Sequence, residues 1–188
     1  MRIIGGKFKG KKISFINSVV TRPLRDYVKE NIFNIITHGK NISLNLDKAK
    51  VLDLYSGVGS FGIECLSRNV KKVVFVEKDP KAFAVLKKNI IDLNFTKGVK
   101  LVSEDIISYI ENFNFTDKFD LIFLDPPYKD TKYLEIISLI KEKKIFNKYH
   151  KIIIHREQKS KEMLEKVINI ELEKNYGRSK IIFGKFSV

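Results

Sequence analysis

The stretch VLDLYSGVGSFGIE at residues 51–64 decides the fold of this chain. It begins with a short apolar run and continues into a loop that holds Gly57, Gly59 and Gly62 in GxGxxG spacing. Glycines in this pattern let the backbone turn tightly between a strand and a helix, and they let a ligand approach the main chain. The stretch therefore predicts a strand, a ligand-binding turn and a helix, as in nucleotide-binding α/β domains.

Short β-branched runs alternate with amphipathic stretches after this loop. We expect strands near residues 50–55, 72–77, 99–103, 119–124 and 150–155, and helices near residues 60–68, 80–93, 105–112, 131–142 and 159–165. Such alternation predicts a mostly parallel sheet with helices on both faces. Two further strand-like runs, 167–174 and 179–187, leave no room for a helix between them. They predict a closing antiparallel hairpin, which gives an α/β domain with a seven-stranded sheet.

A basic arm and a helix precede the loop. Residues 2–16 alternate apolar and basic positions around three glycines, which indicates a short twisted hairpin or an extended arm. Apolar residues at three- and four-residue spacing predict a helix from Leu24 to about Thr37, with Pro23 near its first position. Residues 38–48 predict a linker. We therefore expect an N-terminal unit, residues 1–38, packed on a core domain of residues 39–188.

The composition of the chain narrows the classes of protein to which it can belong. The chain has 188 residues, of which 44% are hydrophobic and 31% charged, and no apolar run approaches the roughly 18 residues that cross a bilayer. No signal peptide is expected either, so the expected location is the cytoplasm, without membrane contact. Cys65 has no partner for a disulfide and is expected to pack in a helix. His38, His150 and His155 are far apart, so we expect ordinary histidines and no metal site.

The net charge of +14 has two explanations. Proteins that bind nucleic acids use Lys and Arg to replace phosphate counterions, but a compositional bias toward Lys also raises the charge, and 30 of the 36 basic residues are lysines. The arginines are more informative, because half of the six lie in the first 25 residues and their planar forks match phosphates and base edges. We therefore expect an RNA-facing N-terminus whose contacts include Arg2, Lys7, Lys9, Arg22 and Arg25.

Carboxylates follow the expected strands at positions that suit a nucleoside ligand. Glu77 lies 20 residues after Gly57, where it can accept hydrogen bonds from ribose hydroxyls, as it would in a dehydrogenase. Asp53 lies beside the loop, where it repels a pyrophosphate and attracts an ammonium group. Asp105 is placed to accept from the amino group of an adenine. Glu77 and Asp105 taken alone are more often helix-capping or surface carboxylates than ligands. The expected cofactor site comprises Asp53, Tyr55, Gly57, Gly59, Glu77, Lys78, Asp105, Ile106 and Asp125.

The motif LDPPY at residues 124–128 predicts a site for a planar amine. Two prolines extend the backbone and remove donors, so the main chain offers acceptors. Asp125 and the carbonyl of Pro126 can accept both hydrogens of an NH2 group, which turns its lone pair toward a methyl donor. Tyr128 can stack on a flipped base. We expect Asp125, Pro126, Pro127 and Tyr128 to form the catalytic motif.

The sequence at this point resembles the class I methyltransferases, and within them the RsmD-like 16S rRNA guanine-N2 methyltransferases. MRIIGGKFKGKKI at residues 1–13 and TRPLRDYVKENIFNII at 21–36 look like the opening strand segment and the Arg-Pro helix of that family, and FVEKDP and LDPPY follow in order. The resemblance implies a Rossmann-like monomer that uses S-adenosylmethionine, releases S-adenosylhomocysteine and needs no metal. It also implies a guanine of 16S rRNA as acceptor, within a partly assembled small ribosomal subunit.

Several alternatives stay open at this stage. The acceptor can be another planar amine, such as adenine N6 or a protein glutamine, although enzymes of that kind often have Asn in place of Asp125. A non-catalytic RNA-binding assembly factor is a second alternative, against which the intact carboxylates argue, and a nicotinamide-dependent dehydrogenase is a third. Leu24 departs from the resemblance, because the family usually has a small hydroxyl residue there.

Overall fold

The computed structural model describes residues 1–16, 24–40, 42–112, 117–160 and 163–187. Its α-helices are α1 (Asp26–His38), α2 (Ser60–Ser67), α3 (Pro80–Asp92), α4 (Ile106–Asn112) and α5 (Tyr133–Glu142). Its strands are β1 (Lys50–Leu54), β2 (Lys72–Val76), β3 (Val99–Val102), β4 (Phe119–Leu124), β5 (Phe146–Glu157), β6 (Asn169–Tyr176) and β7 (Ser179–Lys185). The arm before α1 forms an isolated antiparallel bridge between Arg2 and Lys12.

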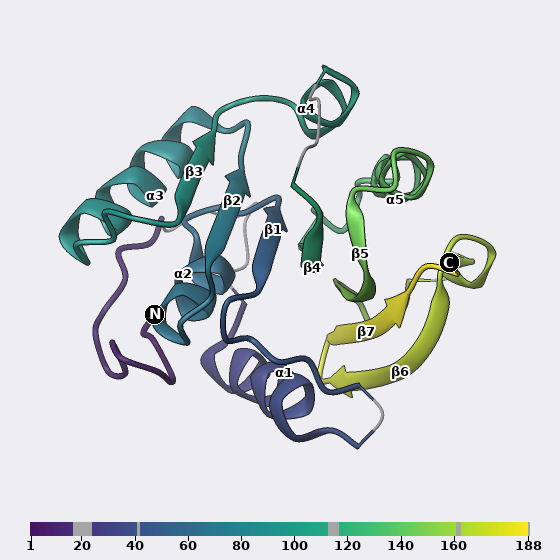
Figure 1. Ribbon diagram of the computed structural model, residues 1–188, viewed down its shortest axis with the longest axis horizontal. Helices are drawn as coiled ribbons and strands as arrows, with labels where there is room; N and C mark the ends of the chain where they lie inside the picture. Colours follow the sequence, from purple (N-terminus) through teal and green to yellow (C-terminus); the bar gives the residue numbers. More distant parts are fainter. Residues whose placement is uncertain (17–23, 41, 113–116, 161–162, 188) are drawn as a thin grey trace.

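All seven strands lie in one sheet, in the order β3-β2-β1-β4-β5-β7-β6 (Figure 1). The first five pair in parallel, and β7 is inserted antiparallel between β5 and β6. The order reverses between β1 and β4, so the loops after these two strands flank the crevice where open α/β sheets bind ligands. The expected sheet with its closing hairpin is confirmed.

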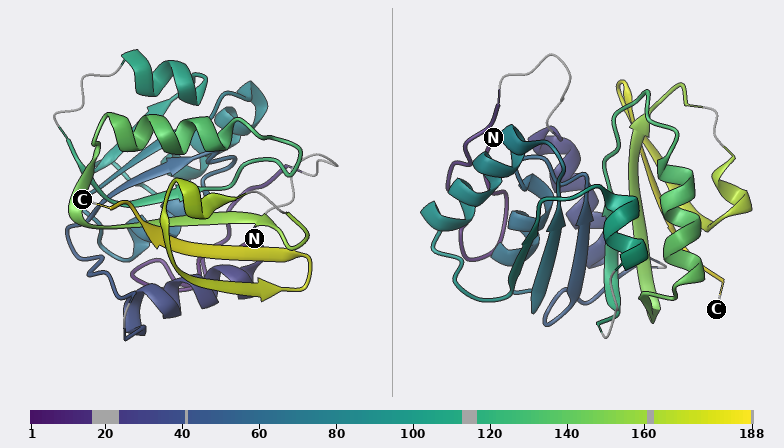
Figure 2. Two further views of the ribbon diagram at one scale, coloured as in Figure 1. Left: turned by 90° about the vertical axis from the view of Figure 1, so that its right-hand side faces the viewer. Right: turned by 90° about the horizontal axis from the view of Figure 1, so that it is seen from above.

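Alternate residues of the central strands pack on opposite faces of the sheet. In β1, Val51 joins the core formed with α1, α2 and α3, whereas Leu52 and Leu54 join the core formed with α4 and α5. Helices α1, α2 and α3 thus cover one side of the sheet, and α4 and α5 cover the other. Figures 1 and 2 show the two helical layers and the hairpin of β6 and β7, whose tip lies beside α1. The expected helices on both faces are therefore confirmed.

Two expected elements differ in the structure. No α-helix covers 159–165 in the part of this range that is described; Leu164–Lys166 forms a 3-10 turn instead. Leu164 is buried and Met163 is exposed, so the segment lacks the second apolar position that a helical face needs. Strand β5 begins at Phe146, earlier than expected, because Phe146 pairs with Phe119 of β4 ahead of an irregularity in the register.

The start of α1 also needs a correction. The helix begins at Asp26 after Arg25, which is two residues later than expected. Pro23, expected near its first position, lies outside the described residues. Leu24, which replaces a small hydroxyl residue of the family pattern, is buried in the core.

The buried carboxylate of Glu64 in α2 holds the N-terminal arm. Its two oxygens accept hydrogen bonds from the main-chain nitrogens of Ile4 at 2.7 Å and Gly5 at 2.8 Å. Lys29 of α1 places its Nζ 3.6 Å from Glu64, and both side chains are fully buried. Burial lowers the pKa of Lys29, and the charge of Glu64 opposes this shift. Arg68 donates to Glu64 at 3.0 Å. The arm, α1 and α2 therefore meet at one charged group.

Asn89 of α3 connects the arm to the glycine loop. Its side chain accepts from the main-chain nitrogen of Ser14 at 2.9 Å and donates to the carbonyl oxygens of Ser14 and Val58, both at 3.0 Å. Val58 lies between the first two glycines of the loop. The arm thus contacts α3 and the glycine loop, while the division into an N-terminal unit of residues 1–38 and a core domain of residues 39–188 stays a prediction.

Glu64→Ala should destabilise the protein strongly. It leaves a buried ammonium and two amide donors without their carboxylate, and removal of one partner of a buried ion pair costs about 3–5 kcal/mol. Urea unfolding followed by circular dichroism measures the change. Asp92→Ala is the matched control, because it removes an exposed carboxylate paired with Lys88 and should change stability by less than about 1 kcal/mol. Equal losses in the two variants would contradict the role of Glu64.

Candidate active site

Four carboxylates gather along the carboxyl edge of the parallel strands. Asp53 lies in β1, Glu77 directly follows β2, Asp105 follows β3, and Asp125 directly follows β4. These strands are neighbours in the sheet, so the structure brings together four residues that the sequence separates by up to 72 positions. The arrangement concentrates negative charge beside the switch point of the sheet, and it favours a cationic ligand.

Asp53 is the most deeply buried of these carboxylates. Its Oδ2 accepts from the main-chain nitrogen of Gly62 at 2.9 Å, whereas its Oδ1 is buried without a hydrogen-bond partner among the described residues. Burial raises its pKa well above the usual range; the hydrogen bond from Gly62 opposes the shift, and the charges of Asp125 and Glu77 add to it. A Cβ at position 62 would lie 2.8 Å from Asp53 Oδ2, so glycine permits the contact. An unpaired buried acceptor among like charges fits an ammonium or sulfonium ligand.

Glu77 shapes the glycine loop. One carboxylate oxygen accepts from the main-chain nitrogen of Gly57 at 2.7 Å, and the other accepts from Asp79 at 2.8 Å. Gly57 and Gly59 have φ angles of 55° and 87°, in the left-handed region that glycine adopts without strain. Gly57 also has open space where a side chain would stand, which suits close approach of a ligand.

Tyr55 connects the glycine loop with the loop after β4. Burial raises the pKa of its hydroxyl, and the charge and hydrogen bond of Asp130 add to the shift. Tyr55 itself has a left-handed φ of 57°. The Tyr55 hydroxyl therefore interacts with a charge of the loop after β4, next to the expected catalytic motif.

Asp105 begins helix α4. Its Oδ1 accepts from the main-chain nitrogen of Ile107 at 3.0 Å, and its Oδ2 lies 3.5 Å from the Nζ of Lys78. Ile106 is buried beside it. The structure therefore places Lys78, Asp105 and Ile106 together, and it shows Asp105 acting as a helix cap. Their contacts with a cofactor stay predictions.

Arg156 of β5 supports the expected catalytic motif. This buried guanidinium donates to the carbonyl oxygens of Pro127 at 3.1 Å and Tyr128 at 3.0 Å, and more weakly to that of Pro126 at 3.5 Å. Its plane also lies 4.4 Å from the centre of the Tyr133 ring in α5. The proline carbonyls therefore act as acceptors for Arg156, and their expected contact with a ligand amine stays a prediction. Sequence reasoning missed Arg156, because only the pairing of β4 with β5 brings it to the motif.

His155 is a second member of the site that sequence reasoning missed. Its Nδ1 lies 2.8 Å from Asp125 Oδ1, and its ring meets that of Tyr128 edge-on at 6.1 Å between centroids. The expectation that all three histidines are ordinary is therefore wrong for His155. His150 fits it, because both ring nitrogens bond to main-chain atoms, the carbonyl of Asn147 and the amide of Phe186.

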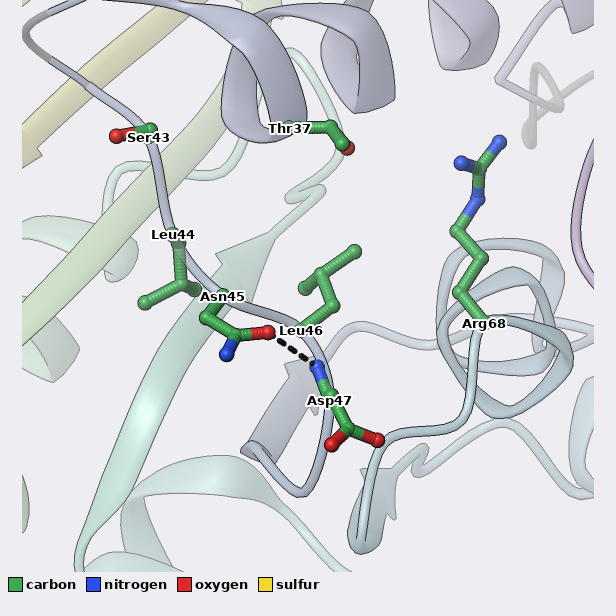
Figure 3. A pocket seen from close by; sticks show the side chains of 7 residues that line it. All are labelled: Thr37, Ser43, Leu44, Asn45, Leu46, Asp47 and Arg68. Carbon is green, nitrogen blue, oxygen red and sulfur yellow. Dashed lines mark hydrogen bonds between the residues drawn. The ribbon is translucent and has the colours of Figure 1, made fainter.

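A cavity of about 450 Å³ lies away from these residues (Figure 3). It is lined by Thr37, Ser43, Leu44, Asn45, Leu46, Asp47 and Arg68. Asp47 precedes β1 and Arg68 precedes β2, so the cavity lies at the opposite edge of the sheet from the carboxylates. None of the expected site residues lines it.

The comparisons with known proteins agree with this geometry. Residues 1–185 match the family model described as Conserved hypothetical protein 95. The chain belongs to this family. It is 31% identical to "Ribosomal RNA small subunit methyltransferase D" of Buchnera aphidicola subsp. Baizongia pistaciae over 99% of this chain and 91% of that protein. It is 34% identical to the protein of the same name from Haemophilus influenzae, over 76% of this chain and 71% of the other.

Solved structures show the same fold. A "putative methylase" from Haemophilus influenzae superposes with a TM-score of 0.78 and 26% identity, and the match covers 99% of this chain and 98% of the other. The class I methyltransferase fold is therefore confirmed, as is the expectation that the chain is a methyltransferase. Neither the relatives nor the buried Asp53 favour the dehydrogenase alternative.

Other expectations concern Cys65, metals and membranes. Cys65 is buried in α2, as expected. Within the described residues, no three His, Cys, Asp or Glu side chains are grouped so that they would hold a metal ion. The helices of the described segments are all too short or too polar to cross a membrane.

Asp53→Asn should stabilise the free protein and weaken donor binding. A carboxyl whose pKa is raised by folding stabilises the fold below its unfolded pKa of about 3.9, and this contribution is lost as pH rises through the folded pKa. At pH 8 the variant should therefore unfold at least about 2 °C above wild type, which corresponds to roughly 1 kcal/mol in a domain of this size, and the gap should close toward pH 4. Thermal unfolding across pH measures it, and calorimetry with S-adenosylmethionine gives the affinity. A wild-type protein that is more stable than the variant at pH 8 contradicts the assignment.

Proposed function

We propose that this chain transfers a methyl group from S-adenosylmethionine to the exocyclic N2 of a guanine in small-subunit ribosomal RNA. The observation that carries the proposal is the position of Asp125 and its proline-rich loop beside Asp53, across the switch point of the sheet. The relatives named as small-subunit rRNA methyltransferases support the RNA substrate. We take the enzyme to be a cytoplasmic monomer that acts without a metal on a partly assembled subunit.

The carboxylates at the carboxyl edge of the sheet define the proposed cofactor-binding site. S-adenosylmethionine supplies a methyl group activated by a positively charged sulfur. Asp53 attracts the cationic part of this donor, Glu77 accepts from ribose hydroxyls, and Asp105 accepts from the adenine amino group. The residues that complete the proposed binding site are Tyr55, Gly57, Gly59, Lys78, Ile106 and Asp125.

Asp125 orients the acceptor amine. Its Oδ1 is engaged by His155, so Oδ2, which has no hydrogen bond among the described residues, is left to accept an N–H of the base. The carbonyl of Pro126 accepts the second hydrogen, and Tyr128 stacks on the ring. Orientation of this kind contributes up to about 7–11 kcal/mol in well-held reactants. As the new C–N bond forms, the nitrogen becomes acidic and releases one proton to Asp125 or to water.

The carboxylate at position 125 favours guanine over adenine. Guanine presents two neighbouring donors, N1–H and the N2 amino group, and a carboxylate is purely an acceptor. Adenine presents one donor beside one acceptor, N6 and N1, which an amide matches better. Asp125 therefore suits the guanine edge, whereas asparagine would suit adenine.

The N-terminal arm provides the proposed RNA-binding surface. Ile3 and Ile13 are buried against the core, whereas Arg2, Lys7 and Lys9 point outward and are exposed. Arg25 is exposed at the start of α1, and Arg2 lies 3.5 Å from Asp26 next to it. Arg22 lies outside the described residues. The arm thus buries its apolar side and offers its cations to a phosphate backbone.

Mass-spectrometric mapping of rRNA tests the proposed reaction. Small ribosomal subunits from cells that lack this protein, incubated with it and isotope-labelled S-adenosylmethionine, should gain one N2-methylguanosine in their RNA. Asp125→Ala should bind the donor like wild type but transfer the methyl group at least a hundredfold more slowly, about 2.7 kcal/mol in the barrier. Label in adenine N6 or in a protein glutamine would instead support the alternative acceptors.

Substitution of three arm cations tests the RNA-binding surface. Replacing Arg2, Lys7 and Lys9 by Ala should weaken RNA binding and flatten its salt dependence, because each lost phosphate contact removes about 0.7 from the slope of log K against log salt for single strands. Replacing Lys141, Lys143 and Lys166, which lie on or next to α5 and on the 3-10 turn, removes the same charge elsewhere. Fluorescence anisotropy at several salt concentrations should separate the two variants, and equal slopes would remove the arm from the interface.

A further inference from the structure

His155 differs from the other buried histidine of the same strand. His150 satisfies both ring nitrogens with main-chain partners. His155 is only 3% exposed, yet it directs Nδ1 to Asp125, while its Nε2 is buried without a hydrogen-bond partner among the described residues. A histidine with a purely structural role would be expected to satisfy both nitrogens, as His150 does. Its contact with Asp125 is therefore the one hydrogen bond that the ring of His155 makes among the described residues.

We propose that His155 is a positioning residue for methyl transfer, whose Nδ1–H holds Oδ1 of Asp125 so that Oδ2 is presented to the acceptor amine. The inference rests on the proposed function, because it assigns to Asp125 the role of amine acceptor. The inference adds to the proposed reaction centre a residue of β5 that lies 30 positions after Asp125 in the sequence.

The surroundings of Asp125 explain why its carboxylate needs to be held. Asp125 is close enough to Asp53 for their charges to interact, and Glu77 adds to the same negative region. A carboxylate with like charges nearby is driven to rotate away from them, and this rotation would spoil its use as an acceptor. The hydrogen bond from His155 fixes one oxygen and opposes the rotation.

The charges that face His155 favour its cationic form. Asp125 faces it from the end of β4, Tyr128 contacts its ring edge, Arg156 is its neighbour on β5, and the residue paired with it on β7 is the apolar Ile181. Burial lowers the pKa of His155, but the charge and hydrogen bond of Asp125 outweigh burial and the repulsion from Arg156, so the pKa is raised. The imidazolium makes a charge-assisted bond, which is stronger than that of the neutral ring.

Single-turnover kinetics with saturating S-adenosylmethionine and small ribosomal subunits test this role. His155→Ala should slow methyl transfer at least tenfold while the affinity for the donor, measured by calorimetry, stays within twofold of wild type. His155→Asn places an amide donor near the position of Nδ1 and should recover most of the rate. The matched control is His150→Gln, which alters a buried histidine of the same strand and should lower the unfolding temperature without slowing transfer.

The pH dependence separates positioning from packing. In wild type the rate should fall as pH rises through the raised pKa of His155, because the charge-assisted bond is lost, and this fall should be missing from His155→Asn. NMR of the imidazole in the free protein gives a readout without any substrate: the pKa of His155 should drop in Asp125→Asn, whereas that of His150 should stay the same.

The outcomes distinguish this inference from the proposed function. If wild type methylates no ribosomal RNA, the proposed function fails, while the NMR titration still reports the pairing of His155 with Asp125. If wild type is active, a His155→Ala rate within twofold of it overturns the positioning role. So does a His155→Asn variant that is as slow as His155→Ala, or one that keeps the wild-type fall with pH.

Discussion

The buried carboxylate of Glu64 is the constraint on which the arrangement of the site depends. It receives two amides of the arm, the ammonium of Lys29 and the guanidinium of Arg68, so three segments distant in sequence meet inside the core. Glu64 also lies in α2, the helix that begins directly after the glycine loop. A charge buried at such cost tolerates little displacement. The arm and α1 are therefore fixed relative to the glycine loop.

Most of the fold could be predicted because the deciding signals are local. The glycine spacing, the β-branched runs and the paired tail strands each arise from residues close together in sequence, and their order then fixes which strand ends meet. Asp53, Glu77, Asp105 and Asp125 were found in this way, since each lies at or just beyond the end of a strand. The expected helix over 159–165 was wrong because charged residues there imitate a solvent-exposed helix without supplying a buried face.

The supporting residues of the site could not be found in the same way. His155 and Arg156 sit in an apolar strand with no motif around them, and their roles depend on the register that places β5 beside β4. Lys29 and Glu64 look like ordinary surface charges of amphipathic helices. Their burial depends on how α1 and α2 pack, which periodicity alone does not specify. Sequence therefore identified the residues that are proposed to face a ligand, and the structure was needed for those that contact and support them.

Opposite charges are separated between the surface and the interior of this protein. The exposed arm is cationic and attracts a polyanion, while the crevice is lined by carboxylates and attracts a cation. Methyl transfer removes the positive charge from the donor sulfur, so the product loses part of its attraction to Asp53, Glu77 and Asp125 at the moment the reaction is complete. If the proposed site is right, the same carboxylates that gather the donor favour release of the spent product, and the proposed RNA contacts come from a different set of charges that the reaction leaves unchanged.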